Sequence, residues 1–298
     1  MIVRTSVIAY VKLGGVVVFW AINFLLIKAA LPSIGPLTLT FFRFVGAAFL
    51  FSIISMVSRK PLLPPVKERP TLALIGVLQI GAVSALSAVG LSLVPPGRAS
   101  VVVYTMPLWA IPIAYLLNGE KLLRGQTMGV ALAMAGLIVF LSPWLVDWSV
   151  ATIATGYLIL VAVAISWAIG ACLLRSRKWA SHSLTQTFWQ LVAGGVITGL
   201  VALVLEGHRP IVWDGAVWSV LLFNWFIASG LCFWWWGQAL EVMPAAEAGQ
   251  FVTLVPIVVL FLSAGFFGEN LSIGIVASAV LISTGVLLTV RAKLRVES

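Results

Sequence analysis

The chain has 298 residues, of which 61% are hydrophobic and only 9% are charged, and its mean hydropathy is +1.13. Because so little polar material cannot cover the surface of a soluble globule, we expect an integral membrane protein. The net charge of +9 does not indicate nucleic-acid binding, since the Lys and Arg residues form short clusters between apolar runs instead of one basic face.

Ten apolar runs are long enough to cross a membrane, since a spanning helix needs about 20 mainly apolar residues. They lie at residues 9–31, 37–57, 71–94, 98–117, 124–142, 154–174, 185–205, 215–240, 246–267 and 271–290. The sequence therefore predicts an all-α membrane protein with ten transmembrane helices. The first run is too long for a signal peptide and no soluble domain follows it, so we expect it to be retained.

The distribution of Lys and Arg predicts the orientation. With a cytoplasmic N-terminus, 14 of the 18 Lys and Arg residues fall on the cytoplasmic side. The outer connectors then hold Arg98 and Arg209, and Lys28 and Arg43 fall within helices. Because cytoplasmic loops are enriched in Lys and Arg, we expect a multi-pass protein of the inner (plasma) membrane with both termini cytoplasmic.

The second half of the chain repeats the first. Identical residues recur at a shift of 149 positions, in the pairs Pro95 and Pro244, Pro107 and Pro256, and Gly136 and Gly285. At a shift of 147, Trp20 falls on Trp167. We therefore divide the chain into two five-helix copies, residues 1–146 and 147–298. Because five is odd, the second copy is inverted, a plan typical of secondary transporters that work by alternating access around a central cavity.

Several motifs of the first copy point to a known family. They are Phe19-Trp20-Ala21-Ile22-Asn23-Phe24 before Lys28, Phe42-Arg43-Phe44, and Pro107-Leu108 leading to Gly119-Glu120-Lys121, Gln126, Gly129 and Gly136. Together they resemble the EamA-type branch of the drug/metabolite transporter superfamily, and the YddG-like aromatic amino-acid exporters in particular. The resemblance implies ten helices, with helices 5 and 10 peripheral and the others around a central cavity, and export of amino acids or other small metabolites.

Polar and aromatic side chains inside the predicted helices are the candidates for a substrate path, because polar groups at membrane depth are costly unless paired or hydrated. Asn23 lies three residues after Trp20, on nearly the same helix face. It either lines the cavity or hydrogen-bonds a neighbouring helix as part of the packing. Trp167 lies in the middle of its helix instead of at the headgroup level, which favours an internal role.

The later helices add further candidates. Asn224, Trp235 and Gln238 share one stripe of the eighth helix, although the three consecutive Trp residues at 234–236 are also typical of an interfacial belt. Tyr104 in the fourth helix is the repeat counterpart of Thr253 in the ninth. The predicted substrate-binding residues are Trp20, Asn23, Gln79, Tyr104, Trp167, Asn224, Trp235, Gln238, Gln250 and Thr253.

Two prolines and several charged residues within or next to the predicted helices are further candidates for functional or structural roles. Pro107 and Pro256 fall in the middle of predicted helices, where each removes a backbone hydrogen bond, so we expect kinks that shape the gates. Lys28 and Arg43 either extend toward the outer surface or attract an anionic group such as a carboxylate. Glu269, like its counterpart at position 120, is expected to cap the helix that follows it. No acid lies deep in a helix, which favours facilitated export over proton exchange.

These features favour a transporter of small neutral metabolites, with aromatic or bulky neutral amino acids foremost and other amphiphilic metabolites or drugs as the alternative. A membrane enzyme would need a nucleophile, a metal cluster or an acid pair at membrane depth, and none of these is visible in the sequence. A channel would need a ring of carbonyls or charges built by oligomer symmetry, and inverted repeats within one chain argue against it. We expect a small-molecule substrate and a lipid bilayer as partners, no metal, cofactor or nucleic acid, and a monomer or weak homo-oligomer.

The orientation can be tested by labelling. In a chain without Cys172 and Cys232, a single cysteine at Asp147 or Asp214 should react with an impermeant thiol reagent added outside intact cells. A cysteine at Lys67 or Lys178 should not react, because we place both on the cytoplasmic side. Reversed labelling would overturn the orientation.

Overall fold

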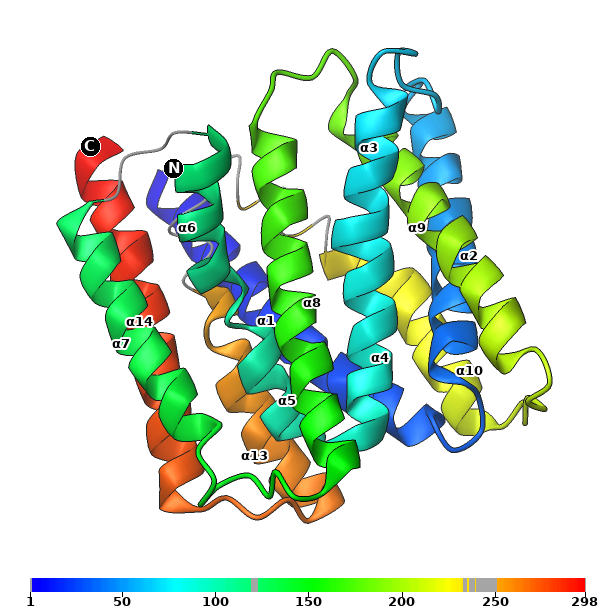
Figure 1. Ribbon diagram of the computed structural model, residues 1–298. Coiled ribbons are helices and arrows are strands. Elements are labelled where there is room, and N and C mark those ends of the chain that lie inside the picture. Colours follow the sequence, from blue (N-terminus) through cyan, green and yellow to red (C-terminus); the bar gives the residue numbers. More distant parts are fainter. Residues whose placement is uncertain (1, 119–122, 233–234, 236–238, 240–250, 298) are drawn as a thin grey trace.

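The computed structural model describes residues 2–118, 123–232, 235, 239 and 251–297, and within these residues it contains helices and connectors but no strand. The helices run up and down in one bundle (Figure 1). In chain order they are α1 (Ile2–Ala30), α2 (Pro36–Val57), α3 (Arg69–Ile75), η1 (Gly76–Ala82), α4 (Val83–Leu93), α5 (Pro96–Val103), α6 (Met106–Asn118), α7 (Arg124–Phe140), α8 (Ala151–Arg175), α9 (Ser183–Glu206), α10 (Gly215–Leu222), η2 (Phe223–Leu231), α13 (Val255–Phe267) and α14 (Ile273–Glu297).

Each predicted apolar run overlaps helical segments of the structure. Six stretches are long and apolar enough to span a membrane, namely Ile8–Ala30, Pro36–Val57, Arg69–Leu93, Pro96–Leu117, Ala151–Leu174 and Ser183–Glu206. The shorter apolar helices are Arg124–Phe140, Gly215–Ser229, Val255–Phe267 and Ile273–Thr289. The all-helical membrane fold is thus confirmed, whereas ten full spans stay a prediction. Cys172 and Cys232 are buried free thiols.

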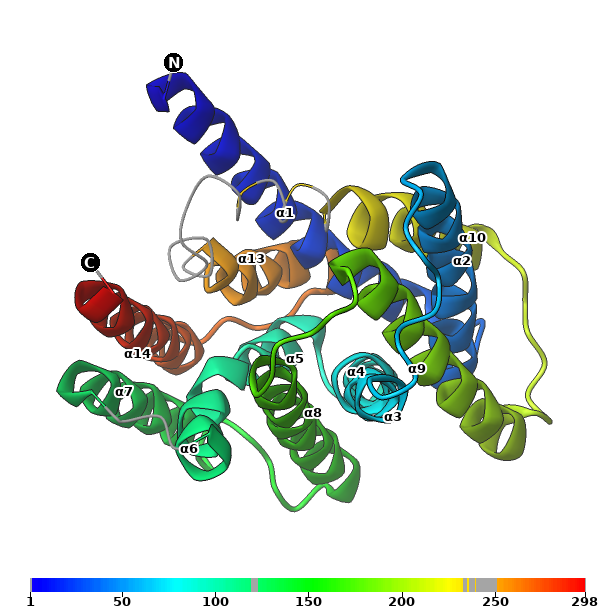
Figure 2. The ribbon, with the colours of Figure 1, turned by 90° about the horizontal axis from the view of Figure 1, so that it is seen from above.

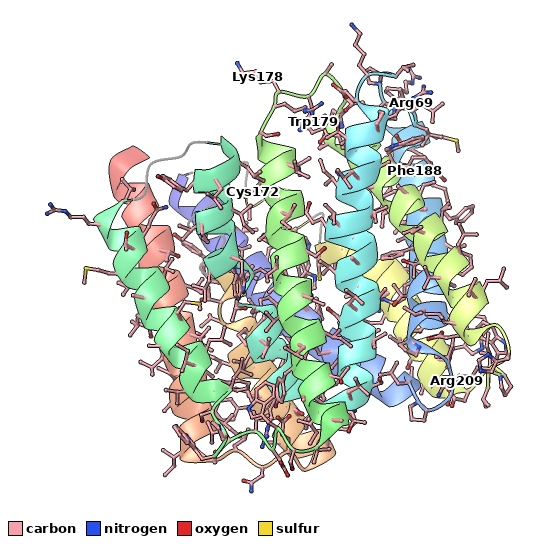
Figure 3. All side chains as sticks on the ribbon, viewed as in Figure 1. Arg69, Cys172, Lys178, Trp179, Phe188 and Arg209 are labelled. Atoms are coloured by element: carbon pink, nitrogen blue, oxygen red, sulfur yellow. The ribbon has the colours of Figure 1, made fainter. Side chains whose placement is uncertain are left out.

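The two chain ends lie at the same end of the bundle (Figure 1), which we call the terminal end. Arg69, the first residue of α3, and the connector that carries Lys178 also lie there, and Arg209 lies at the opposite, distal end (Figure 3). Two cations on which the predicted orientation depends, Arg69 and Lys178, therefore lie at one physical end of the molecule.

Two π-helical segments occupy repeat-equivalent places. η1 follows α3 and η2 follows α10, and they begin 147 positions apart, which is the shift found between the two halves of the sequence. Each presents a carbonyl to a side chain of another helix. Leu78 O accepts from Ser166 Oγ of α8 at 2.8 Å, and Ala228 O accepts from Trp20 Nε1 of α1 at 3.4 Å. π segments within helices occur frequently at functional sites.

The chain also breaks its helices at two repeat-equivalent turns. One turn, at residues 104–105, separates α5 from α6, and the other, at residues 253–254, precedes α13. Pro107 and Pro256 take the second positions of α6 and α13, where a missing N–H costs little because first-turn N–H groups have no helical acceptor. Pro107 thus lies within the candidate span Pro96–Leu117, but each proline opens a new helix after a turn and does not kink a continuous one, and its role at a gate stays a prediction.

At the distal end, Glu206 fastens α9 to the first turn of α2. Its carboxylate accepts hydrogen bonds from the N–H groups of Leu37 and Thr38 at 3.1 and 2.9 Å, and from the Thr38 hydroxyl at 2.8 Å. A carboxylate is favourable there, because the unpaired N–H groups and the dipole of a helix N-terminus attract negative charge.

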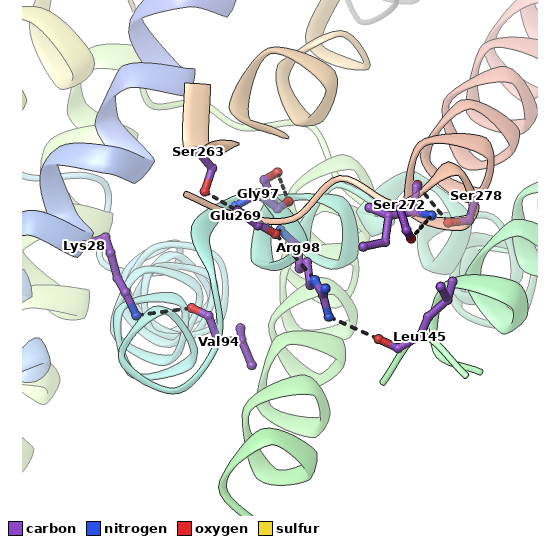
Figure 4. A network of polar contacts seen from close by, with 11 residues as sticks. Lys28, Val94, Gly97, Arg98, Leu145, Ser263, Glu269, Ser272 and Ser278 are labelled. Atoms are coloured by element: carbon purple, nitrogen blue, oxygen red, sulfur yellow. Dashed lines mark hydrogen bonds and ion pairs between the residues drawn. The ribbon is translucent and has the colours of Figure 1, made fainter. Parts of the chain in front are cut away.

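Glu269 makes the same kind of contact, but not with the expected helix. Its carboxylate accepts from the N–H groups of Gly97 and Arg98 in α5 at 2.9 and 3.0 Å, while Ser263 Oγ donates to it at 2.5 Å (Figure 4). The following helix, α14, is served instead by Ser272, whose Oγ accepts from Ile275 N. The prediction that Glu269 caps the next helix is therefore wrong, because the first turn of α5 is folded back against it.

α7 and α14 lie side by side at the edge of the bundle (Figure 2). A Cβ on Gly129 would lie 2.6 Å from the carbonyl oxygen of Gly285, and a Cβ on Gly285 would lie 2.5 Å from the backbone nitrogen of Ala133. Small residues thus allow the two backbones to approach closely, as in many membrane helix pairs.

This packing predicts the effect of a larger side chain. Gly285→Val should lower the free energy of unfolding by about 1 to 3 kcal/mol, because the new side chain overpacks the α7–α14 contact. The measurement is the melting temperature in detergent. Gly265→Val is the matched control, since a Cβ on Gly265 would meet nothing within 4 Å. Equal melting temperatures for the two variants would contradict the prediction.

Candidate functional site

A chain of hydrogen bonds joins three helices inside the bundle. Arg43 Nε of α2 donates to Asn224 Oδ1 of η2 at 2.9 Å, and Asn224 Nδ2 donates to Asn23 Oδ1 of α1 at 2.7 Å. The same Nδ2 donates to the carbonyl of Val220, one turn earlier, at 2.8 Å. Asn224 is 1% exposed. It is the junction of what we call the polar cluster, which consists of Asn23, Arg43 and Asn224.

The polar cluster lies well within the helices that carry it. Asn224 is nine residues beyond the start of α10 and Arg43 is seven beyond the start of α2. At 1.5 Å per residue these positions are about 10 to 14 Å from the distal helix ends. The Nε of Arg43 bonds sideways to η2, so the interpretation that Arg43 only extends toward the outer surface is wrong.

Aromatic side chains flank the cluster. Trp20 lies one turn before Asn23 on α1 and donates to the carbonyl of Ala228 in η2. The ring of Phe24, next to Asn23 in the chain, lies 6.1 Å from the ring of Tyr104 at the break between α5 and α6. Trp20, Phe24 and Tyr104 all pack against one buried apolar group contributed by α1 and α13. One stretch of α1 therefore presents amide, indole and phenyl groups within a single turn.

The structure brings four predicted site residues together around α1, namely Trp20, Asn23, Tyr104 and Asn224. Thr253 is buried in the turn before α13. Gln238 and Gln250 lie outside the described residues.

Three other predicted residues lie apart from the polar cluster. A Cβ on Gly170 of α8 would lie 2.8 Å from the Cβ of Gln79, so Gln79 packs against α8, in which Trp167 is half-buried. Trp235 packs against the earlier part of α1, where a Cβ on Gly15 would lie 2.6 Å from its ring. These side chains contact other parts of the bundle, and no described contact joins them to Asn224.

Lys28 binds the end of α4 at the distal end of the bundle. Its Nζ donates to the carbonyls of Leu91 and Val94 at 2.5 and 3.3 Å, where α4 ends (Figure 4). Such carbonyls have no partner within their own helix. Lys28 also borders a cavity of about 570 Å³, whose lining residues include Pro36, Ser92 and Arg209.

The acidic side chains that the structure describes all bind backbone N–H groups near helix ends. They are Glu68, Asp147, Glu206, Asp214 and Glu269. The Ser33 hydroxyl and the Val217 N–H lower the pKa of Asp214 below its ordinary value, which keeps this cap of α10 ionised at neutral pH.

Within the described part of the chain, the one ion pair joins Arg98 and Glu269, and no group of three His, Cys, Asp or Glu could hold a metal.

Sequence reasoning left Arg43 out of the predicted binding set. The signal was present, since a cation within an apolar run is rare enough to suggest a functional role. Its partner could not be inferred, because Asn224 lies 181 positions away in the chain.

Comparison with known proteins identifies the family to which the chain belongs. The model of the EamA-like transporter family matches residues 8–142 and again residues 154–291. A probable amino-acid metabolite efflux pump of Salmonella typhimurium is 30% identical over 288 residues, which cover 92% of each chain. The aromatic amino acid exporter YddG of Ancylobacter novellus is 24% identical over 194 residues, 64% of this chain and 66% of that protein. A crystal structure 18% identical in sequence shares the fold, with a TM-score of 0.64 over 99% of this chain and 98% of its own.

A bundle of apolar helices with a polar cluster inside it is the architecture of a multi-pass membrane transporter. The chain belongs to the EamA-like transporter family of the drug/metabolite transporter superfamily, so the resemblance carried by its motifs is confirmed. Family and relatives indicate a transporter and not an enzyme, and the bacterial relatives imply the plasma membrane.

The two helix breaks can be tested through their prolines. In Pro107→Ala and Pro256→Ala, the restored N–H favours a continuous helix across each turn. We expect transport to slow by roughly tenfold while the folded protein stays abundant, and flux in liposomes measures this. Pro112→Ala is the control, because Pro112 lies inside α6 and has no proline counterpart in the second half. Wild-type flux in both test variants would leave the prolines as packing features.

Proposed function

We propose that the protein exports small neutral metabolites, with aromatic or bulky neutral amino acids as its preferred substrates. The observation that carries this proposal is the Asn23–Asn224 amide pair beside the rings of Trp20, Phe24 and Tyr104. Amides bind ammonium and carboxylate groups without the cost of a buried ion, and aromatic pairs contribute about 0.5 to 1.5 kcal/mol beyond their buried area. Contacts of this strength suit an exporter, which must release what it binds.

Two relatives support the substrate class. One is named a probable amino-acid metabolite efflux pump and the other an aromatic amino acid exporter. Both names fit a site in which indole and phenyl groups lie next to amides.

The proposed mechanism is alternating access between two inverted five-helix copies, residues 1–146 and 147–298, with ten spans and both termini cytoplasmic. The double match of the family model supports the division. So do the π segments and helix breaks, which recur at repeat-equivalent places. In such transporters the two copies rock about a site between them. The turns before Pro107 and Pro256 provide the hinges in this scheme. We propose facilitated export and not proton exchange, because the described acids bind backbone N–H groups near helix ends and do not lie deep in a helix.

The proposal predicts which tryptophans matter. Trp20→Ala and Trp167→Ala should lower the efflux of labelled phenylalanine from liposomes by about tenfold, because each removes an aromatic face from the proposed path. Trp213→Ala and Trp218→Ala are the controls, since both side chains are 46% exposed and their rings lie 5.4 Å apart near the distal end. The controls should change flux by less than about twofold.

The same liposomes test the substrate class. Phenylalanine and tryptophan should be carried in preference to aspartate, glutamate and sugar phosphates. Faster movement of aspartate, glutamate or sugar phosphates would refute the assignment of the site.

A further inference from the structure

The polar cluster breaks the symmetry of the repeat. The backbone features, namely the π segments and the helix breaks, occur in both halves at matching positions. The cluster does not, since at the shift of 147 the residues paired with Asn23, Arg43 and Asn224 are Gly170, Gln190 and Val77. The cluster is therefore not part of the framework that the two halves share.

Arg43 is a cation with no counter-ion among the described residues. Its Nε is taken by Asn224 Oδ1, and its two Nη groups have no acceptor in the described part of the chain. Every acidic side chain described there bonds elsewhere, at a helix end. Because an unpaired charge at membrane depth is costly, an anion that enters the site would be bound favourably.

We infer that Arg43 binds the carboxylate of the substrate, and that the site selects aromatic monocarboxylates whether or not they carry an amino group. This inference rests on the proposed function, and it changes the role given to the substrate's charges. A guanidinium presents a planar fork of donors that matches a carboxylate in two parallel hydrogen bonds. With Nε held by Asn224, both Nη groups can serve that purpose. The described residues around the cluster offer no acid for an ammonium group, so that group is not selected.

Two analogues of phenylalanine separate the charges. Phenyllactate keeps the carboxylate and replaces the ammonium by a hydroxyl group, whereas phenylalaninol keeps the ammonium and replaces the carboxylate by a hydroxymethyl group. Apparent dissociation constants come from the ligand-dependent rise in melting temperature of the purified full-length protein. We expect phenyllactate to bind within about threefold of phenylalanine and phenylalaninol to bind at least about tenfold more weakly.

Two variants test whether the preference for phenyllactate over phenylalaninol depends on Arg43. Arg43→Gln removes the charge and should abolish the preference for phenyllactate. Asn224→Asp places a carboxylate beside Arg43, so this internal counter-ion should weaken phenyllactate by at least about tenfold. The melting temperature of the free variant is measured as well, because the aspartate side chain has no N–H for Asn23 Oδ1 and the Val220 carbonyl. Lys28→Gln is the matched control, because Lys28 is also a cation within a helix but bonds the carbonyls of Leu91 and Val94. It should leave the preference unchanged.

The outcomes distinguish this inference from the proposed function. Phenylalanine flux that exceeds the flux of protein-free liposomes supports the proposed function whatever the analogues do. The inference is overturned if phenylalaninol binds the wild type as well as phenyllactate, if neither analogue raises the melting temperature, or if Asn224→Asp binds phenyllactate like the wild type. Preferential binding of phenyllactate that is lost in Asn224→Asp supports the inference even where flux is absent.

Discussion

Inside a lipid bilayer, every backbone N–H and carbonyl must find its partner within the protein. This chain interrupts its helices repeatedly, and a side chain serves the exposed backbone at several of these places. Carboxylates accept hydrogen bonds from first-turn N–H groups, and a lysine donates to the last carbonyls of a helix. A serine and a tryptophan donate to carbonyls of the π segments. These side chains are Glu206, Glu269, Lys28, Ser166 and Trp20. The broken helices are stable because these side chains bond the backbone groups that the breaks leave without a partner.

This constraint also determines which charges remain for function. The described acids are held at helix ends, and Lys28 is held at the end of α4. Arg43 is different, because its partner is a neutral amide and not a backbone carbonyl or an acid. Among these charges, Arg43 is therefore the one that stays available in the interior of the bundle.

How much could be read from the sequence depends on how local the signal is. Apolar runs predicted the helical fold, and the motifs of the first copy predicted the family, because spanning length and short motifs are visible along the chain. The partner of Glu269 was missed, since capping was expected within neighbouring residues and the real partner, Gly97, is 172 positions away. The π segments were missed as well, because neither has a residue signature that differs from an ordinary apolar helix. Arg43 was seen, but its place near the end of an apolar run fits two orientations equally well.

The orientation of Asn224 connects the charge of the site to the packing of the helices that carry it. Both N–H groups of its amide are used, by Asn23 Oδ1 and by the carbonyl of Val220, so its oxygen must face Arg43. A carboxylate at this position would neutralise the guanidinium, whereas the amide holds it in place and leaves its charge free. Asn23 and Arg43 lie in the first proposed copy and Asn224 lies in the second. If the two copies rock as proposed, the motion would stretch both hydrogen bonds to Asn224 and would change the direction of the guanidinium between the two states.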